Sequence, residues 1–250
     1  MLTSPEPQAV PLLRGQVAGA QWLVTSRLGG VSVAPFDTWN LGGHVGDDPA
    51  AVAANRARLD RLVGHRVVFA DQVHGREVAV VDPCSPNGSR ASCDALVAPA
   101  GVAVGVLVAD CVPVLLAAPD IGAVAAVHAG RRGVQLGVVA AAVARLGELG
   151  ADAARLGAVV GPAVCAACYE VGGALRAEVA AAVPATWAVS ASGTPALDLR
   201  SGVVAQLAEQ GVGDVAVVGG CTRQTPELFS YRRSSATGRF AAVVWRDVPA

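Results

Sequence analysis

The chain has 250 residues, of which 53% are hydrophobic and 16% are charged, and its formal net charge is −1 at pH 7. This composition excludes an intrinsically disordered chain, and the length suffices for one large domain with a buried core. The sequence has no basic stripe with interleaved aromatic residues, which argues against nucleic-acid binding. It also has no secretory signal pattern and no apolar run of membrane-spanning length. We therefore expect a cytoplasmic protein with no membrane partner and with reduced cysteines.

The order of turn signals and apolar segments predicts a domain that mixes helices and strands. Residues 1–15 are rich in proline and are expected to form a loosely ordered N-terminal arm, followed by a single catalytic domain over residues 16–250. Strands are predicted at 21–25, 67–69, 78–81, 95–97, 102–108, 111–117, 123–127, 156–160, 215–218 and 240–245. Helices are predicted at 49–64, 134–149, 173–183 and 201–210, with a loop or short helix at 163–169. Because several apolar runs suit strands buried on both faces and no strict βαβ rhythm is present, we expect an α+β fold with mixed α/β layers, in which buried β-sheets are flanked by helices.

The segment between the first strand and the first helix is too rich in Gly, Asn, Asp and Pro for regular structure. A long irregular stretch inside a compact domain is usually functional. Arg27, Asn40 and His44 lie in this segment, and Arg56 follows in the predicted helix. Such polar groups can line a pocket, whereas the alternative for Asn40 and Arg56 is that they only satisfy the backbone of the loop.

Three potential metal ligands lie at the edges of apolar runs. His74 belongs to a Gln-Val-His-Gly turn, Cys111 begins one predicted strand, and His128 follows another. One thiolate and two imidazoles fit a zinc site with an open fourth position, which is the catalytic pattern. Asp110 precedes Cys111 and is predicted to orient a ligand or a water from behind it. The alternatives are two unrelated loop histidines with a core cysteine, or a cysteine hydrolase with Cys111 as nucleophile and a histidine as base.

Two further clusters have both a functional and a structural interpretation. Cys165 and Cys168 form a Cys-x-x-Cys pattern, which is typical of a redox pair or half a zinc site, but no second such pair accompanies it, and a structural role is favoured. Arg131 and Arg132 open a predicted helix and could bind an anion there, or could be solvated charges. The Tyr-Arg-Arg sequence at 231–233 with Arg239 is a second basic cluster, for which a surface salt-bridge network is the alternative.

Taken together, these stretches resemble the laccase-domain family, also called the YfiH or multicopper polyphenol oxidase type, whose members are regarded as purine nucleoside phosphorylases. The matching motifs span nearly the whole chain in order. They are Arg27-Leu28-Gly29-Gly30-Val31-Ser32, Trp39-Asn40-Leu41-Gly42, Gly46-Asp47-Asp48-Pro49, Asn55-Arg56, Gln72-Val73-His74-Gly75, Ala109-Asp110-Cys111-Val112-Pro113, His128-Ala129-Gly130-Arg131-Arg132-Gly133, Gly161-Pro162, Tyr169-Glu170-Val171-Gly172, Cys221-Thr222 and Phe229-Ser230-Tyr231-Arg232-Arg233.

The resemblance implies that His74, Cys111 and His128 are zinc ligands in the catalytic centre. It implies phosphorolysis of adenosine and inosine, and of methylthioadenosine, to the base and ribose 1-phosphate, with adenosine deamination as a side activity. We expect Arg132 and Arg56 to bind phosphate, and Asn40 and His44 to lie near the nucleoside. In deamination, zinc would lower the pKa of a bound water toward ~7, with Asp110 or His44 moving protons.

Other readings of the same site remain open. The family's older label implies a copper-dependent polyphenol oxidase, although four histidines are few for several coppers. A metal-stabilised binding protein without catalysis would be favoured if Cys84 or Cys93 closed the metal shell. The family usually has Trp where this chain has Arg131, which either adds positive charge near the pocket or faces solvent. A monomer is favoured as the oligomeric state.

Overall fold

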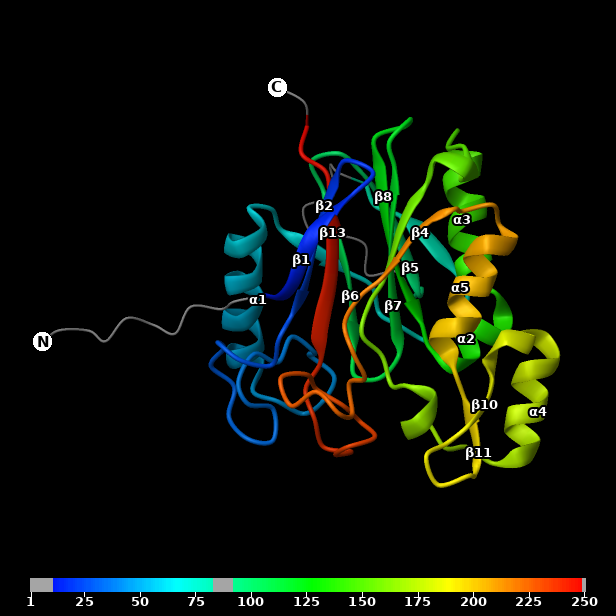
Figure 1. The fold of residues 1–250 in the computed structure, drawn as a ribbon. Helices are drawn as coiled ribbons and strands as arrows, with labels where there is room; N and C mark the ends of the chain where they lie inside the picture. The colour runs from blue at the N-terminus through cyan, green and yellow to red at the C-terminus, as the bar shows by residue number, and fades with distance from the viewer. Residues whose placement is uncertain (1–10, 83–91, 249–250) are drawn as a thin grey trace, which may run out of the picture.

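The computed structural model describes residues 11–82 and 92–248, which form four layers (Figure 1). The strands are β1 (Pro11–Val17), β2 (Ala20–Thr25), β3 (Val67–Phe69), β4 (Val78–Val80), β5 (Ala95–Pro99), β6 (Ala103–Val108), β7 (Val112–Ala118), β8 (Ala123–Ala129), β9 (Gly157–Val160), β10 (Trp187–Val189), β11 (Pro195–Leu197), β12 (Asp214–Val217) and β13 (Phe240–Trp245). The α-helices are α1 (Pro49–Val63), α2 (Arg131–Leu136), α3 (Val138–Glu148), α4 (Gly173–Ala182) and α5 (Leu199–Glu209), and short 3₁₀ turns lie at Ala153–Arg155, Ala166–Cys168 and Pro184–Thr186.

Two mixed sheets form the centre of the molecule. The five-stranded sheet has the order β1-β2-β13-β6-β3, and the six-stranded sheet has the order β12-β9-β7-β8-β5-β4. The pairs β3/β6, β4/β5 and β9/β12 are parallel, and the other pairs in the two sheets are antiparallel. The strands β10 and β11 form a separate hairpin beside α4. The expected fold class, with buried mixed sheets flanked by helices, is therefore confirmed.

The apolar runs explain the layering. Every residue of β6, β7 and β8 is buried, as expected for strands covered on both faces. The facing sides of the two sheets enclose one apolar cluster that includes Trp22, Leu115 and Phe240. The outer face of the six-stranded sheet packs on α2, α3 and α5, and the outer face of the five-stranded sheet packs on α1. This packing fixes the ends of the central strands, where the candidate site lies.

The structure corrects three expectations. The N-terminal arm was expected to reach residue 15, but residues 11–15 belong to β1, which pairs antiparallel with β2; residues 1–10 lie outside the described segments. The expected helix at 134–149 is two helices, because Gly137 has a left-handed backbone with φ of 80° that ends α2 and begins α3. The short strands β10 and β11 were not expected, since three-residue strands carry little periodic signal.

The irregular segment before α1 is held by a buried asparagine of that helix. Asn55 is fully buried, and its backbone carbonyl accepts a hydrogen bond from the indole of the buried Trp39 at 3.1 Å. Its side-chain amide donates to Ser32 Oγ, Thr38 O and Asn40 O and accepts from the Val31 N–H. One side chain thus forms hydrogen bonds with four polar groups of a loop that has no regular backbone hydrogen bonding of its own.

Within the described residues, the helices are too short or too polar to cross a bilayer, and the longest of them, α1, has 15 residues.

We expect Asn55→Ala to lower the free energy of unfolding by about 3 kcal/mol, because the truncation leaves several buried loop groups without a hydrogen-bond partner. Urea denaturation followed by circular dichroism measures the change. Arg61→Ala, an exposed position on the same helix, is the control and should change stability by less than about 0.5 kcal/mol. Equal effects of the two substitutions would show that Asn55 does not hold the loop.

Candidate active site

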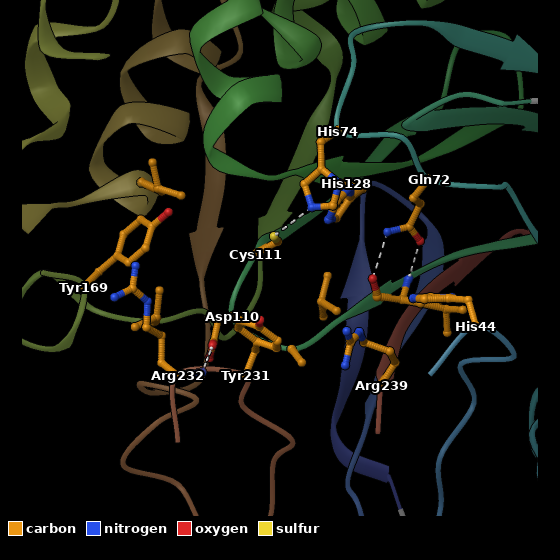
Figure 2. A pocket seen from close by; sticks show the side chains of 15 residues that line it. His44, Gln72, His74, Asp110, Cys111, His128, Tyr169, Tyr231, Arg232 and Arg239 are labelled. Atoms are coloured by element: carbon orange, nitrogen blue, oxygen red, sulfur yellow. Dashed lines mark hydrogen bonds between the residues drawn. The ribbon is translucent and has the colours of Figure 1, made fainter. Parts of the chain in front are cut away.

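The fold brings His74, Cys111 and His128 together, as the sequence predicts. The antiparallel pairing of β7 and β8 places Pro113 opposite His128, so Cys111, which directly precedes β7, lies beside the end of β8. His74 approaches from the loop after β3 (Figure 2). The ligand atoms of the three side chains all lie within 4.8 Å of one another, and Cys111 Sγ is 3.9 Å from His74 Nε2. Three segments that are distant in sequence therefore present two nitrogens and one sulfur to a single point.

A buried carboxylate, Asp94, orients this group from behind. Its side chain accepts a hydrogen bond from His128 Nδ1 at 2.8 Å, which leaves Nε2 as the free nitrogen of that ring. It also accepts from the backbone N–H groups of Val73, His74 and Gly75 at 3.3, 3.0 and 2.6 Å. Asp94 is only 1% exposed. A carboxylate that fixes the tautomer and position of a histidine in this way is the usual support of a metal ligand.

The sequence predicts that Asp110 orients a ligand or a water; the structure shows Asp94 in contact with the ligand His128, and orientation of a water by Asp110 stays a prediction. The Asp110 carboxylate accepts hydrogen bonds from Thr222 Oγ1 at 2.5 Å and from the Arg232 N–H at 2.7 Å. Asp110 therefore holds the C-terminal loop against the cavity instead of a ligand. Asp94 was missed because no motif surrounds this residue. Only the pairing of β5 with β8 brings Asp94 next to His128.

The space around the three side chains fits a metal ion. A Cβ atom at Gly130 would lie 2.8 Å from His74 Cδ2, 3.2 Å from Cys111 Sγ and 3.4 Å from His128 Cε1, so only glycine leaves room for all three side chains there. Nitrogen and thiolate ligands of this kind suit zinc and also copper. His74, Cys111 and His128 can therefore bind a metal, with one coordination position left for another ligand.

The closed four-ligand alternative has no support among the described residues. Cys93 is 2% exposed and is part of the apolar cluster between the sheets, and it does not belong to the His-Cys-His group. Cys84 lies outside the described residues.

Cys111 and His128 form an ion pair in the metal-free protein. Burial opposes a charged thiolate, but the charge and hydrogen bonds of His128 and His74 outweigh it and lower the pKa of Cys111 to about 6. Burial likewise opposes a charged imidazole, but Cys111 and Asp94 outweigh it and raise the pKa of His128 to about 9. At pH 7 the sulfur is therefore a thiolate, which is the form that binds metals and attacks electrophiles.

A cavity of about 590 Å³ opens over the three side chains. Its polar lining also includes His44, Gln72, Tyr169, Tyr231, Arg232 and Arg239 (Figure 2). The Gln72 amide is fully used by Leu107, donating to its carbonyl and accepting from its N–H, both at 2.8 Å. Gln72 therefore supports the wall, and the remaining polar side chains are available to a ligand.

Two arginines carry positive charge into this cavity. The Arg232 guanidinium lies over the Tyr169 ring, 4.6 Å from its centroid, and donates to the Glu170 carbonyl at 3.0 Å. The Arg239 guanidinium donates to the carbonyls of Thr237 and Gly238. Burial lowers the pKa of Arg239, whereas the nearby charge of Cys111 opposes that shift. Both cations thus line the same cavity as Cys111, on elements that the sequence did not connect with it.

Of the predicted substrate residues, His44 lines the cavity, whereas Asn40 and Arg56 form hydrogen bonds with groups of the loop before α1. His44 lines the cavity, and burial, followed by the charges of Arg239 and Arg56, lowers its pKa, so its ring is neutral at pH 7. Asn40 is fully buried, and its amide bonds Gly42, Asp47 and the Arg239 N–H. The Arg56 Nε–H donates to the Leu41 carbonyl at 2.9 Å, and its guanidinium lies 5.3 Å from the Phe69 ring centroid.

The structure therefore does not place Asn40, Arg56 or Arg132 among the residues that line the cavity. Arg132 is exposed on α2. Its neighbour Arg131 is half-buried and close enough to Tyr169 for its charge to act on that phenol, which favours the view that Arg131 adds positive charge near the pocket. The substrate-binding roles of Asn40, Arg56 and Arg132 stay predictions, whereas tyrosines and arginines of the C-terminal half line the cavity together with the metal ligands.

In the metal-free protein we expect iodoacetamide to alkylate Cys111 with a midpoint near pH 6, because the neighbouring histidines stabilise its thiolate. Peptide mass spectrometry after timed alkylation from pH 5 to 9 measures the profile. Cys111→Ser identifies the peptide, and Cys93, whose pKa is raised by burial, is the internal reference. A midpoint for Cys111 above pH 8 would contradict the ion pair.

Comparison with known proteins agrees with the sequence motifs. Residues 21–247 match the family of the multi-copper polyphenol oxidoreductase laccase. A Streptomyces coelicolor protein named purine nucleoside phosphorylase is 54% identical over 94% of this chain and 98% of its own length. A Deinococcus radiodurans protein of the same name is 40% identical over 94% of this chain and 92% of its own.

Solved structures give the same result for the fold. The crystal structure of the Neisseria meningitidis protein NMB0706 matches with a TM-score of 0.85 at 34% identity, over 94% of this chain and 99% of that one. The structure of YlmD from Geobacillus stearothermophilus matches with a TM-score of 0.84 at 30% identity, over 96% and 100% of the two chains. On sequence and fold alike, the chain belongs to the multi-copper polyphenol oxidoreductase laccase family.

Proposed function

We propose that this protein is a zinc-dependent purine nucleoside phosphorylase that cleaves adenosine and inosine with phosphate. Methylthioadenosine is a further candidate substrate. The observation that carries the proposal is that a His-Cys-His metal-binding group and two guanidinium groups open into the same cavity, which two tyrosine side chains also line. The names of the relatives in Streptomyces and Deinococcus support this assignment.

The reaction sets clear demands on the site. A phosphate oxygen forms a bond to C1′ of the ribose while the bond from C1′ to N9 of the purine breaks. The purine leaves with that electron pair and takes up a proton, and the ribose passes through an oxocarbenium-like state. The site must therefore hold a dianion beside the sugar, position the purine ring, and provide a hydrogen bond or proton to the leaving base.

Arg232 and Arg239 meet the first demand. Their guanidinium groups supply planar, permanently charged donors, and such groups bind phosphate oxygens in pairs. Hydrogen bonds to the carbonyls of Glu170, Thr237 and Gly238 restrict both side chains before substrate arrives. A phosphate between them would lie near Cys111, since the charge of Arg239 already interacts with that thiolate.

Tyr169, Tyr231 and His44 meet the other demands. The cavity volume of about 590 Å³ is in the range of small-molecule sites and exceeds what phosphate alone needs. The Tyr231 ring, and the face of the Tyr169 ring that Arg232 does not cover, provide flat apolar surfaces for the purine. His44, neutral at pH 7, can accept or donate a hydrogen bond to a purine nitrogen. We assign these three residues to base binding.

His74, Cys111 and His128 would hold the zinc ion. Bound zinc would supply a Lewis acid that polarises an oxygen or nitrogen of the substrate, or that activates water for removal of the 6-amino group of adenosine. We include adenosine deamination as a side activity of the same cavity, with His44 as the neutral group within it that can accept a proton. Copper in the same ligands is the alternative, with oxidation of phenols as its activity.

We expect purified, zinc-loaded protein to release hypoxanthine from inosine and adenine from adenosine only when phosphate is present. His128→Ala and chelation should each reduce this release by at least ~10³-fold, because both remove the metal site. Chromatography of the products gives the rates, and His65→Ala, a histidine bonded to Asp247 away from the cavity, should keep full activity.

Other outcomes of the same assay would redirect the assignment. Inosine formation from adenosine without any phosphate-dependent base release would leave only the deaminase. Phenol oxidation by the copper-loaded protein, with no turnover of nucleosides by the zinc-loaded protein, would support the oxidase and contradict the proposal.

The proposed phosphate-binding role can be tested by comparing Arg239 with Arg132. We expect Arg239→Met to raise the KM for phosphate by roughly 10- to 100-fold with a smaller change in the KM for inosine, because a charge-assisted donor to the anion is lost. Arg132→Met, on the exposed face of α2, should change neither value by more than about twofold. Steady-state kinetics with phosphate varied at saturating inosine measures both. The reverse ranking would restore Arg132 as the phosphate residue.

A further inference from the structure

Three cysteines meet outside the cavity. Cys165 directly precedes the 3₁₀ turn at Ala166–Cys168, Cys168 ends that turn, and Cys221 lies in the segment after β12. A β-bridge between Ala163 and Cys221, with a hydrogen bond from the Thr222 N–H to the Ala163 carbonyl at 3.1 Å, brings the two segments side by side. The three sulfur atoms lie within 4.8 Å of one another. The Cys-x-x-Cys pattern, which lacked a partner in the sequence, has one in Cys221.

Burial raises the pKa of the Cys165 thiol to about 11, so a bound metal ion must displace the proton of this cysteine. The backbone N–H of Cys165 donates a hydrogen bond to Cys221 Sγ at 3.4 Å. Cys168 and Cys221 are 8% and 7% exposed, while Cys165 is half-buried and lies at the edge of the cluster. A path for an ion therefore exists past Cys165, and the other two sulfurs are already shielded from water by Val164 and Tyr169.

We infer that Cys165, Cys168 and Cys221 form a second metal site, which binds a soft metal ion, Zn²⁺ or Cu⁺, through three thiolates. Two cysteines separated by two residues on a tight turn, completed by a third from another segment, is a recurrent thiolate arrangement. Soft sulfur ligands select these two ions over Mg²⁺ or Ca²⁺. Metal–sulfur bonds of ~2.3 Å require the sulfurs to draw slightly closer than they lie here.

The position of this site gives it a structural consequence. Val164 and Tyr169, next to two of the cysteines in sequence, line the cavity. Thr222, next to the third, donates to the Asp110 carboxylate. An ion held by the three sulfurs would therefore join the segment of Val164 and Tyr169, which lines the cavity, to the segment whose Thr222 holds Asp110. The inference does not depend on the reaction carried out there.

Metal stoichiometry tests the site directly. The protein is reduced, stripped by chelation and reloaded without oxygen, once with Zn²⁺ and once with Cu⁺, and bound metal is counted by mass spectrometry after gel filtration. We expect two equivalents per chain of at least one ion for the wild type and one for Cys111→Ser, which disables the His-Cys-His group. The double variant Cys111→Ser/Cys165→Ala should bind none, whereas Cys111→Ser/Cys93→Ser should still bind one.

Cobalt spectra of the Cys111→Ser and Cys165→Ala variants provide a second measurement. Co²⁺ bound to three thiolates should give sulfur-to-metal charge-transfer absorption about three times as intense as Co²⁺ bound to Cys111 alone, in proportion to the number of sulfur ligands. A wild type that binds a single equivalent of each ion, all of it lost in Cys111→Ser, would overturn the inference. So would peptide mapping that finds two of the three cysteines joined in a disulfide while the stripped protein is kept under reducing conditions.

Discussion

The buried carboxylate of Asp94 is the interaction on which the rest of the site depends. It receives hydrogen bonds from the ring of His128 and from three successive backbone N–H groups of the His74 loop. A carboxylate that is 1% exposed is costly unless all these donors are in place. The same contacts that make the carboxylate tolerable therefore set the positions of two of the three metal ligands. The third, Cys111, follows from the pairing of β7 with β8.

A second carboxylate, that of Asp110, holds another part of the cavity lining in place. Asp110 connects Thr222 and the Arg232 backbone to the start of β7. Both His74 and Asp110 have left-handed backbones, with φ of 58° and 106°, although neither is glycine. Conformations of this kind cost free energy and are kept where surrounding contacts demand them. Here the hydrogen bonds of Asp94 hold the His74 turn, and those of the Asp110 side chain hold its own turn, so strain is concentrated beside the metal ligands.

Much of this organisation can be predicted from the sequence. What cannot be predicted are the roles that depend on contacts between distant segments. Long apolar runs such as 112–118 predict buried strands, and chemically distinctive residues such as Cys111 and His128 stand out at strand edges. Asp94 and Cys221 could not be assigned, since their roles exist only through partners brought near by sheet pairing. Asn40 was expected near the nucleoside, but the structure uses its amide to hold the loop and the Arg239 backbone. A polar residue in an irregular segment can hydrogen-bond either to the backbone of the loop or to a bound ligand. The sequence alone does not show which of the two it does.

The charges in the cavity connect the metal ligands with phosphate binding. Without metal, the protonated His128 balances the Cys111 thiolate, and the Asp94 carboxylate adds a negative charge behind them. A divalent ion would displace the proton of His128 and balance both Cys111 and Asp94, so the net charge of the site would rise by one. Arg232 and Arg239 would then face only Asp110 as an opposing charge among the residues that line the cavity. Loading the proposed zinc site would thus strengthen attraction of a dianion even without direct contact between metal and phosphate, because Coulomb interactions extend beyond the first contact in a partly enclosed cavity.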